Sequence, residues 1–357
     1  MPRPELSAVF DPAGMLATAR SIASVQHASG EIPWFEGGHS DPWDHIECAM
    51  ALAVGGLRDE AVAAYEFLRV TQRPDGSWPT KVRAGVVEDP SFETNQCAYI
   101  AVGVWHHLLL TGDNAFVARM WPVVCAALDL VTNLATDRGE IPWSVMDGMP
   151  RDEALLTGSS STYHSLRAGL ALAEHLGSPQ PDWEIAAGRL GHVIADHPEA
   201  FLDKARFSMD WYYPVLAGAV RDEAARERIA SRWDDFVVAG LGIRCVDDEP
   251  WVTGAETAEL VMAMANAGMT DRAAALFAEV QHLRTPEGAY WTGWQFVSEV
   301  NWPAEQSTWT AAANVLAADL LGNLTPASAA FRIDALPSVP DLGDAPCGCS
   351  TDAAAVR

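Results

Sequence analysis

Basic residues are scarce in this sequence. Its 357 residues include 23 Lys and Arg against 48 Asp and Glu, so the formal net charge is −25. A surface this acidic repels nucleic acid and anionic lipid, because both carry negative charge themselves. The composition therefore predicts that neither nucleic acid nor an acidic membrane surface is a partner, and that the ligand is a small molecule.

Long apolar runs and a secretory leader are also lacking. No stretch of about 18 apolar residues is present to form a membrane span, and no apolar run follows the basic residue near the start, as it would in a secretory signal. Cysteines number six. Cys48, Cys97 and Cys125 lie inside apolar helical patterns, as small core residues do. These features predict a reduced, cytoplasmic protein without a membrane span.

Cofactor motifs are missing as well. The sequence has no phosphate-binding loop, no dinucleotide-binding glycine fingerprint, no Cys-x-x-Cys pair and no Ser-His-Asp order. We therefore predict no cofactor and no metal ion.

Helical periodicity is what the sequence has in abundance. Apolar residues recur at three- and four-residue spacing in segments rich in Ala and Leu, whereas alternating patterns are nearly absent. The predicted helices cover residues 46–54, 59–70, 94–110, 115–134, 160–175, 183–196, 222–236, 256–267, 271–282 and 308–321. Short turns and longer loops alternate between these helices, and this alternation predicts a series of helical hairpins.

The longer loops repeat one theme. Gly-Glu-Ile-Pro-Trp at 30–34 recurs unchanged at 139–143. Looser copies end at Trp78 and Trp291, and the loops around Trp211 and Trp251 complete the set. A hairpin cannot bury its apolar face alone, and about six of them can close into a ring. The sequence thus predicts an all-α fold, an (α/α)6 toroid spanning residues 1–330 as one domain.

The C-terminal segment has a different composition. After residue 330 the helical pattern gives way to Pro, Gly and Asp, so residues 331–357 are predicted to be a strap or a disordered tail. Cys347 and Cys349 lie in this segment, and two thiols alone do not make a structural zinc site.

Tryptophan is frequent, with 14 residues, and many lie in or beside the repeated loops. Loops of successive hairpins emerge at one end of a toroid, so these rings are predicted to surround one pocket. Aromatic faces there suit a sugar or an isoprenoid chain. The predicted substrate-binding residues are Trp34, Trp43, Trp143, Asp210, Trp211, Glu256, Trp291 and Trp302.

Carboxylates accompany these aromatic residues. Asp44, Glu153, Glu256 and Glu305 each lie beside Trp or Gly near the predicted start of a helix. Acidic side chains are common at helix N-termini for reasons of the helix dipole alone. Two carboxylates across a pocket are also what hydrolysis of an acetal requires, one to protonate the leaving oxygen and one to activate water.

Several segments resemble the glucoamylase family (glycoside hydrolase family 15). Trp43-Asp44 before an Ala-rich helix is similar to the family's first hairpin, and Pro303-x-Glu305-Gln306 is similar to its general-base segment. The resemblance spans about residues 40–320 and implies an α/α toroid with an inverting hydrolase mechanism. It implies Glu305 as general base and Glu153 as general acid, with Asp44 in reserve to position a sugar hydroxyl. As the acid, Glu153 is expected to be buried against aromatic rings, with a raised pKa.

A second resemblance competes with the first. Gln72-x-x-Asp75-Gly76-Ser77-Trp78 is similar to the repeat motif of terpenoid cyclases and the prenyltransferase/squalene-cyclase superfamily, which shares the toroid. This alternative implies an isoprenoid substrate. A prenyl diphosphate needs Mg²⁺ or a basic cluster, for which Lys81, Arg83 and Arg244 are the candidates. The remaining alternatives are a non-catalytic sugar-binding toroid and a sugar isomerase.

Overall fold

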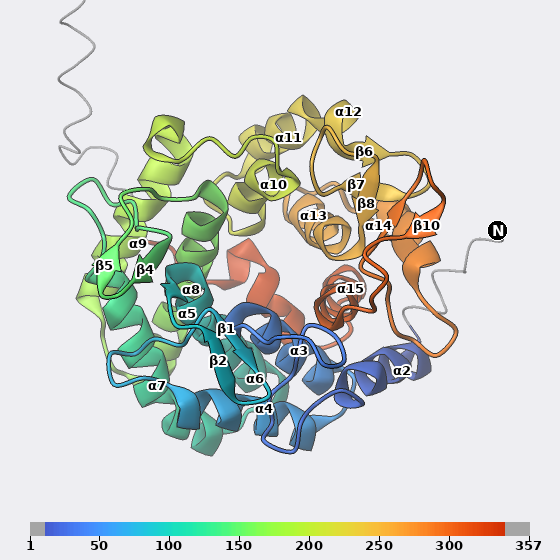
Figure 1. Cartoon of the computed structure of the whole chain (residues 1–357). Helices are drawn as coiled ribbons and strands as arrows, with labels where there is room; N and C mark the ends of the chain where they lie inside the picture. The colour runs from blue at the N-terminus through green and yellow to red at the C-terminus, as the bar shows by residue number, and fades with distance from the viewer. Residues whose placement is uncertain (1–10, 340–357) are drawn as a thin grey trace, which may run out of the picture.

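The helices form two concentric layers in this computed structural model, which describes residues 11–339 (Figure 1). The inner layer consists of α3 (Pro42–Val54), α5 and α6 (Thr94–Ala98 and Ile100–Thr111), α8 (Leu156–Leu176), α10 (Ser208–Leu216), α13 (Gly254–Asn266) and α15 (Thr308–Gly322). The outer layer consists of α2 (Pro12–Ala23), α4 (Arg58–Thr71), α7 (Asn114–Thr132), α9 (Pro181–Asp196), α11 (Asp222–Ser231) and α14 (Thr270–Val280).

The inner helices close a ring. Along it α3 packs on α6, α6 on α8, α8 on α10, α10 on α13, α13 on α15, and α15 again on α3. Each outer helix packs against an inner one, as α4 does on α3 and α9 on α8. The apolar core fills the space between the layers. The predicted (α/α)6 toroid is thus confirmed.

All long connections lie at one end of the ring. They run from an outer helix to the N-terminus of the next inner helix, and we call this end the rim. The rim connections cover residues 24–41, 72–93, 133–155, 197–207, 232–253 and 281–307. The return connections are short, such as residues 55–57 and 112–113. The alternation of short turns and long loops in the sequence therefore corresponds to the two ends of the toroid.

Short antiparallel strands in the rim connections were not predicted. β1 (Lys81–Arg83) and β2 (Val86–Asp89) form a hairpin. A second sheet has the order β3 (Phe92–Glu93), β4 (Ser144–Met146), β5 (Met149–Pro150). The third runs β10 (Val300–Asn301), β9 (Gly293–Gln295), β8 (Trp251–Thr253), β7 (Gly242–Arg244), β6 (Val237–Val238). Segments of two to four residues are too short for an alternating pattern to show.

Two helices were missed and one was predicted too long. α2 and α10 lay outside the predicted segments, and α10 contains Pro214, which weakens a helical signal. The predicted helix 222–236 is interrupted at Arg232, and α12 (Trp233–Phe236) follows. Because α10 is helical, Trp211 lies in an inner helix and not in a loop; the loop prediction for it was wrong.

The repeated loop motif forms one turn four times. The amide of residue 27 donates to the carbonyl of residue 31, and the same bond joins 73 to 77, 136 to 140 and 285 to 289, with N–O distances of 2.8–2.9 Å. Each turn contains a glycine with positive φ: Gly30, Gly76, Gly139 or Gly288. A Cβ atom on any of them would lie 2.2–2.7 Å from an atom of a neighbouring outer helix. In these four rim connections the glycine of the motif therefore lets the chain pack closely against the next outer helix.

A glutamine reinforces two of these turns. The Gln72 side chain donates to the carbonyls of Gly76 and Val123, each at 3.0 Å, and so joins its own turn to α7. Gln26 joins Gly30 and Glu60 in the same way. The Gln-x-x-Asp-Gly-Ser-Trp sequence that resembles terpenoid cyclases thus has a structural role here.

Replacing Gly76 by Ala should destabilise the fold by about 3 kcal/mol, because φ is +92° and the new Cβ would meet the Ala126 carbonyl oxygen at 2.2 Å. The matched control is Gly148→Ala, where φ is +74° and no heavy atom lies within 4 Å. That variant should lose only about 1 kcal/mol. Urea denaturation of both variants measures the difference, and equal losses would contradict the packing role.

The far end of the ring is covered by the chain after α15. The 3-10 helices η3 (Pro326–Phe331) and η4 (Ile333–Ala335) lie there, and η3 packs against α6 and α15. The buried guanidinium of Arg167 on α8 donates to the carbonyls of Ile333, Leu336 and Pro337 at 2.7–3.1 Å. Cys347 and Cys349 lie outside the described residues.

Within residues 11–339 one helix, α7, is long and apolar enough to span a membrane by length and composition alone. The same helix packs in the outer layer against α5, α6 and α9. A core helix passes the same test, so the observation is weak evidence for a span.

Candidate active site

An aromatic contact marks the centre of the ring. Trp43 on α3 meets Tyr213 on α10 edge to face, with ring centroids 5.6 Å apart. Because α3 and α10 stand on opposite sides of the ring, this contact crosses its centre (Figure 1). Tyr99, between α5 and α6, lies on Trp43 at the same centroid distance.

Three carboxyl groups surround this contact, and we call them the central carboxylates: Asp44 and Glu47 on α3, and Glu259 on α13. Their exposed fractions are 8%, 1% and 0%. None forms an ion pair with Lys or Arg among residues 11–339. Buried carboxylates without a cationic partner are costly to a fold, so their presence points to a chemical role.

Hydrogen bonds distinguish the three groups. Glu259 accepts from Tyr212 at 2.5 Å on one oxygen and from Tyr213 at 2.8 Å on the other. Oε1 of Glu47 accepts from Tyr99 at 3.0 Å and from the Trp43 indole at 3.3 Å. The Trp309 indole on α15 also bonds to the Glu47 carboxyl group.

Asp44 belongs to an acidic pair. Asp41 caps α3 by accepting the Asp44 amide at 3.0 Å, and the two carboxyl groups also share a hydrogen bond. A bond between two carboxyl groups requires a proton on one of them.

Burial controls the protonation of the central carboxylates. It raises the pKa of Asp44 well above the ordinary range, and repulsion from Asp41 adds to the shift. Burial also raises the pKa of Glu259 well above its ordinary value, with repulsion from Glu47 as the next cause. The pKa of Glu47 rises to about 7, again through burial. The centre of the ring is thus able to hold a proton near neutral pH, which general acid catalysis requires.

These shifts predict an unusual dependence of stability on pH. A carboxyl group whose pKa is raised on folding binds more protons in the folded state, so the free energy of unfolding falls as pH rises from the unfolded to the folded pKa. For Glu47 that window runs from 4.5 to about 7. Between about pH 5 and pH 8, the wild type should lose on the order of 3 kcal/mol relative to Glu47→Gln.

Urea denaturation at the two pH values tests this dependence. The control is Glu36→Gln, which changes an exposed carboxylate and should follow the wild type. If Glu47→Gln loses as much stability with rising pH as the wild type does, Glu47 is not protonated in the folded state and the assignment is wrong.

The two residues first predicted as the catalytic pair lie elsewhere on the rim. Glu305 is half-buried before α15, where its carboxylate accepts from the Trp34 indole at 3.0 Å and from Thr292 at 3.3 Å. Glu153 lies between β5 and α8 and is exposed. The expectation that Glu153 is buried against aromatic rings was therefore wrong, because the segment 151–153 before α8 is exposed to solvent.

The predicted substrate-binding residues divide into two groups. Trp34, Trp143, Trp291 and Trp302 lie in rim connections, and Trp302 is 57% exposed. Trp211 points between the layers, where it stacks on Phe236 at 5.3 Å and donates to the Arg228 carbonyl. It is absent from the rim because its position in α10 directs the ring toward α11.

Two acidic residues that were predicted to bind substrate, Asp210 and Glu256, form hydrogen bonds within the protein. The Asp210 carboxylate accepts from the Thr157 amide at 3.2 Å and hydroxyl at 2.6 Å, and so ties α10 to the start of α8. Glu256 is buried in the first turn of α13, and burial raises its pKa. A hydrogen bond links it to the Cys245 thiol.

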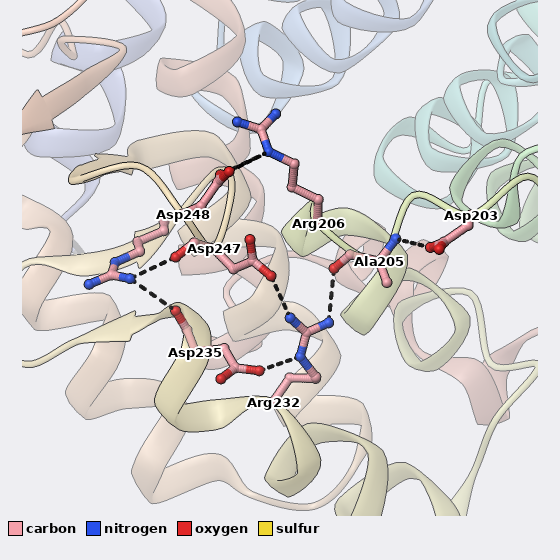
Figure 2. Close-up of polar contacts among 8 residues, drawn as sticks. Asp203, Ala205, Arg206, Arg232, Asp235, Asp247 and Asp248 are labelled. Atoms are coloured by element: carbon pink, nitrogen blue, oxygen red, sulfur yellow. Dashed lines mark hydrogen bonds and ion pairs between the residues drawn. The ribbon is translucent and has the colours of Figure 1, made fainter.

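Figure 2 shows two arginines near the rim, Arg206 and Arg232, that acidic side chains engage. Arg232 lies between Asp235 and Asp247, and Arg206 donates to Asp248 at 2.8 Å. Arg244 donates to the Asp247 carbonyl at 2.8 Å, and Arg83 pairs with Glu88. Two of the basic candidates for a diphosphate site, Arg83 and Arg244, are thus held by the protein's own acceptors.

Sequence reasoning missed Glu47 and Glu259 as site residues. A signal was present, because Asp44 and Glu47 on α3 have the same three-residue spacing as Glu256 and Glu259 on α13. Such spacing places both carboxyl groups on one helix face. Glu259 also directly precedes an apolar run, residues 260–265, a position at which a charged side chain favours function over solvation.

Comparison with known proteins places this site in context. No family model matches the chain. The MMP endo-(1,4)-3-O-methyl-alpha-D-mannosidase of Mycolicibacterium hassiacum is 55% identical over 348 residues, which cover 98% of this chain and 97% of that protein.

Solved structures share the fold at low sequence identity. A wild-type glycosidase superposes with a TM-score of 0.67 at 15% identity, covering 87% of this chain and 98% of its own. The GH63 mannosylglycerate hydrolase of Thermus thermophilus gives 0.64 at 14% identity, covering 84% and 99%. A D-mannose isomerase gives 0.61 at 10% identity, covering 87% and 98%. Since an isomerase shares the toroid, the fold alone does not select hydrolysis. The 55% identity over almost the whole length does, and the chain belongs to the glycoside hydrolase family that includes the Mycolicibacterium endo-mannosidase.

Proposed function

We propose that this protein is an endo-acting hydrolase that cleaves α-mannosidic bonds within an O-methylated mannan, with inversion at the anomeric carbon. The identity with the Mycolicibacterium enzyme supports the substrate class. The observation that carries the proposal is the set of central carboxylates, which are buried and form no ion pair with Lys or Arg in the described part of the chain. Acetal hydrolysis needs this combination of a proton donor and a base.

We assign the general acid to Asp44. Its raised pKa and its hydrogen bond with Asp41 keep a proton at the N-terminus of α3. When a glycosidic oxygen lies against Asp44, that proton passes to the oxygen as the bond to the anomeric carbon breaks. Repulsion from Asp41 makes a charged Asp44 unfavourable in the resting enzyme, and its reprotonation after each turnover is favoured for the same reason.

We assign the general base to Glu259. Both of its oxygens accept tyrosine hydroxyls. These two hydrogen bonds favour the ionised carboxylate and so act against burial, which raises the pKa of Glu259. In this role Glu259 removes a proton from the water that attacks the anomeric carbon from the face opposite the leaving group. Glu47 interacts electrostatically with both groups and is assigned to return protons between them.

The rim residues are assigned to sugar binding. Trp34, Trp43, Trp143, Trp291 and Trp302 offer aromatic faces for the C–H surfaces of successive sugar units. Glu305 is held by Trp34 and Thr292 and is assigned to a sugar hydroxyl. Glu305 as base with Glu153 as acid remains the competing assignment, favoured by the family resemblance of the Glu305 segment.

The test is hydrolysis of a defined 3-O-methylated α-1,4-mannooligosaccharide. We expect fragments from internal cleavage in mass spectra, and the β-anomer as the first product in proton NMR spectra. First appearance of the α-anomer would refute inversion, release of single terminal sugars would refute endo action, and no cleavage would refute the proposed function.

A further inference from the structure

A second candidate ligand site lies outside the centre of the ring. It is a cavity of about 310 Å³ between α3, α4 and the β1–β2 hairpin, which we call the hairpin cavity. Its apolar lining includes Pro42, Phe67, Leu68, Trp78, Pro79, Val82 and Val87. The volume is at the lower end of the range that small-molecule pockets occupy, about 300–1,000 Å³.

We infer that the hairpin cavity binds an O-methyl-bearing face of the substrate chain and makes the enzyme selective for methylated sugar. This inference rests on the proposed function. Methylation replaces a hydroxyl hydrogen by an apolar group, and an apolar wall accepts that group while leaving an unmethylated hydroxyl without a partner. Selectivity for methylation therefore requires a surface of this kind near the cleaved bond.

The polar side chains of the lining are Ser40, Asp41, His45, Thr71 and Arg73, and the hydrogen bonds of Ser40 and His45 are made within the protein. His45 uses both ring nitrogens, with the Ile32 amide at 3.1 Å and the Ala64 carbonyl at 2.9 Å. The Ser40 hydroxyl donates to Glu31 at 2.9 Å. Because the Ser40 hydroxyl and both His45 nitrogens are already hydrogen-bonded, they do not bind a sugar hydroxyl, and this favours an apolar substituent at that part of the wall.

Asp41 connects the hairpin cavity to the proposed acid. It lines the hairpin cavity, and its carboxylate also accepts the Asp44 amide at 3.0 Å. The two sites thus share one side chain, so a sugar unit in the hairpin cavity lies close to the unit cleaved at Asp44. This adjacency suits a chain substrate that extends beyond the cleaved bond.

The β1–β2 hairpin, which forms one wall of the hairpin cavity, is held in place by hydrogen bonds. Buried Glu31 accepts the Gly85 amide of the hairpin turn at 2.9 Å and the Ser40 hydroxyl at the same distance. Arg83 of β1 bonds to the Gly37 carbonyl. The hairpin is therefore anchored to the first rim connection, and an anchored wall binds with less loss of conformational entropy than a free loop.

The double variant Val82→Thr/Val87→Thr tests the inference. Threonine keeps the shape of valine but places a hydroxyl on the wall. For a 3-O-methylated mannooligosaccharide kcat/KM should fall roughly tenfold, mainly through KM, while the value for the unmethylated oligosaccharide should not fall. The control is Val86→Thr on the same hairpin, a 66% exposed residue outside the lining, which should match the wild type.

Thermal unfolding of each variant checks that folding is unchanged, and Val87→Thr alone replaces the double variant if stability falls. An equal loss on both substrates, or no loss on either, overturns the inference. If wild-type protein cleaves neither substrate, the proposed function fails, and calorimetric titration still decides this inference. Methyl 3-O-methyl-α-D-mannoside should then bind more tightly than methyl α-D-mannoside to the wild type but not to the double variant; equal binding to the wild type refutes it.

Discussion

Replacing Glu259 by Gln is expected to lower kcat on O-methylated mannan by about 10³-fold or more, on the order of the loss seen when a general base is removed. The amide keeps the shape of the side chain and still accepts one tyrosine hydroxyl, but it does not take a proton from water. Asp44→Asn should cause a loss of similar size, because an amide does not protonate the leaving oxygen. Initial rates at saturating substrate measure both variants.

Glu305→Gln is the comparison that separates the two assignments of the base. In the proposed mechanism Glu305 binds a sugar hydroxyl, so its variant should raise KM more than it lowers kcat. Conversely, if Glu305→Gln and Glu153→Gln abolish turnover while Glu259→Gln retains it, catalysis lies at the rim and the central carboxylates have another role. Binding of substrate to the inactive variants, followed by tryptophan fluorescence, shows whether their folds are intact.

Replacing Arg167 by Met is expected to destabilise the protein by about 3–5 kcal/mol. The guanidinium is fully buried on α8 and bonds to three carbonyls of the chain that covers the far end of the ring. Burial lowers its pKa to about 10, so it remains charged at neutral pH. Methionine fills a similar volume but leaves the three carbonyls without donors.

The control for Arg167 is Arg332→Met. Arg332 belongs to the same covering segment, but it is exposed and bonds to Asn323 at 3.1 Å. Its loss should cost less than about 0.5 kcal/mol. Guanidinium denaturation of both variants provides the comparison, and a loss below about 1 kcal/mol for Arg167→Met would show that the covering segment contributes little to stability.

The errors in the predicted site have a common physical cause. Glu153 and Glu259 are both acidic residues next to apolar segments, and the spacing that singles out Glu259 does not say toward which layer of the ring its side chain points. Burial depends on which face of a helix points to the centre, and that is settled only when six hairpins close. Trp211 illustrates the same point, because its ring points to α11 although its neighbours Tyr212 and Tyr213 reach Glu259.

By itself, the sequence determined the ring. Its helical periodicity, its alternating turn lengths and the repeated Gly turns are local features, because helix formation and positive φ act within a few residues. Only the tertiary structure decided where the chemistry lies. Asp44 was among the predicted residues, but its role beside Glu47 was not, and Glu259 is more than 200 residues away along the chain. They meet because ring closure brings α3 and α13 to one centre, where exclusion of water raises the pKa of each of the three carboxyl groups.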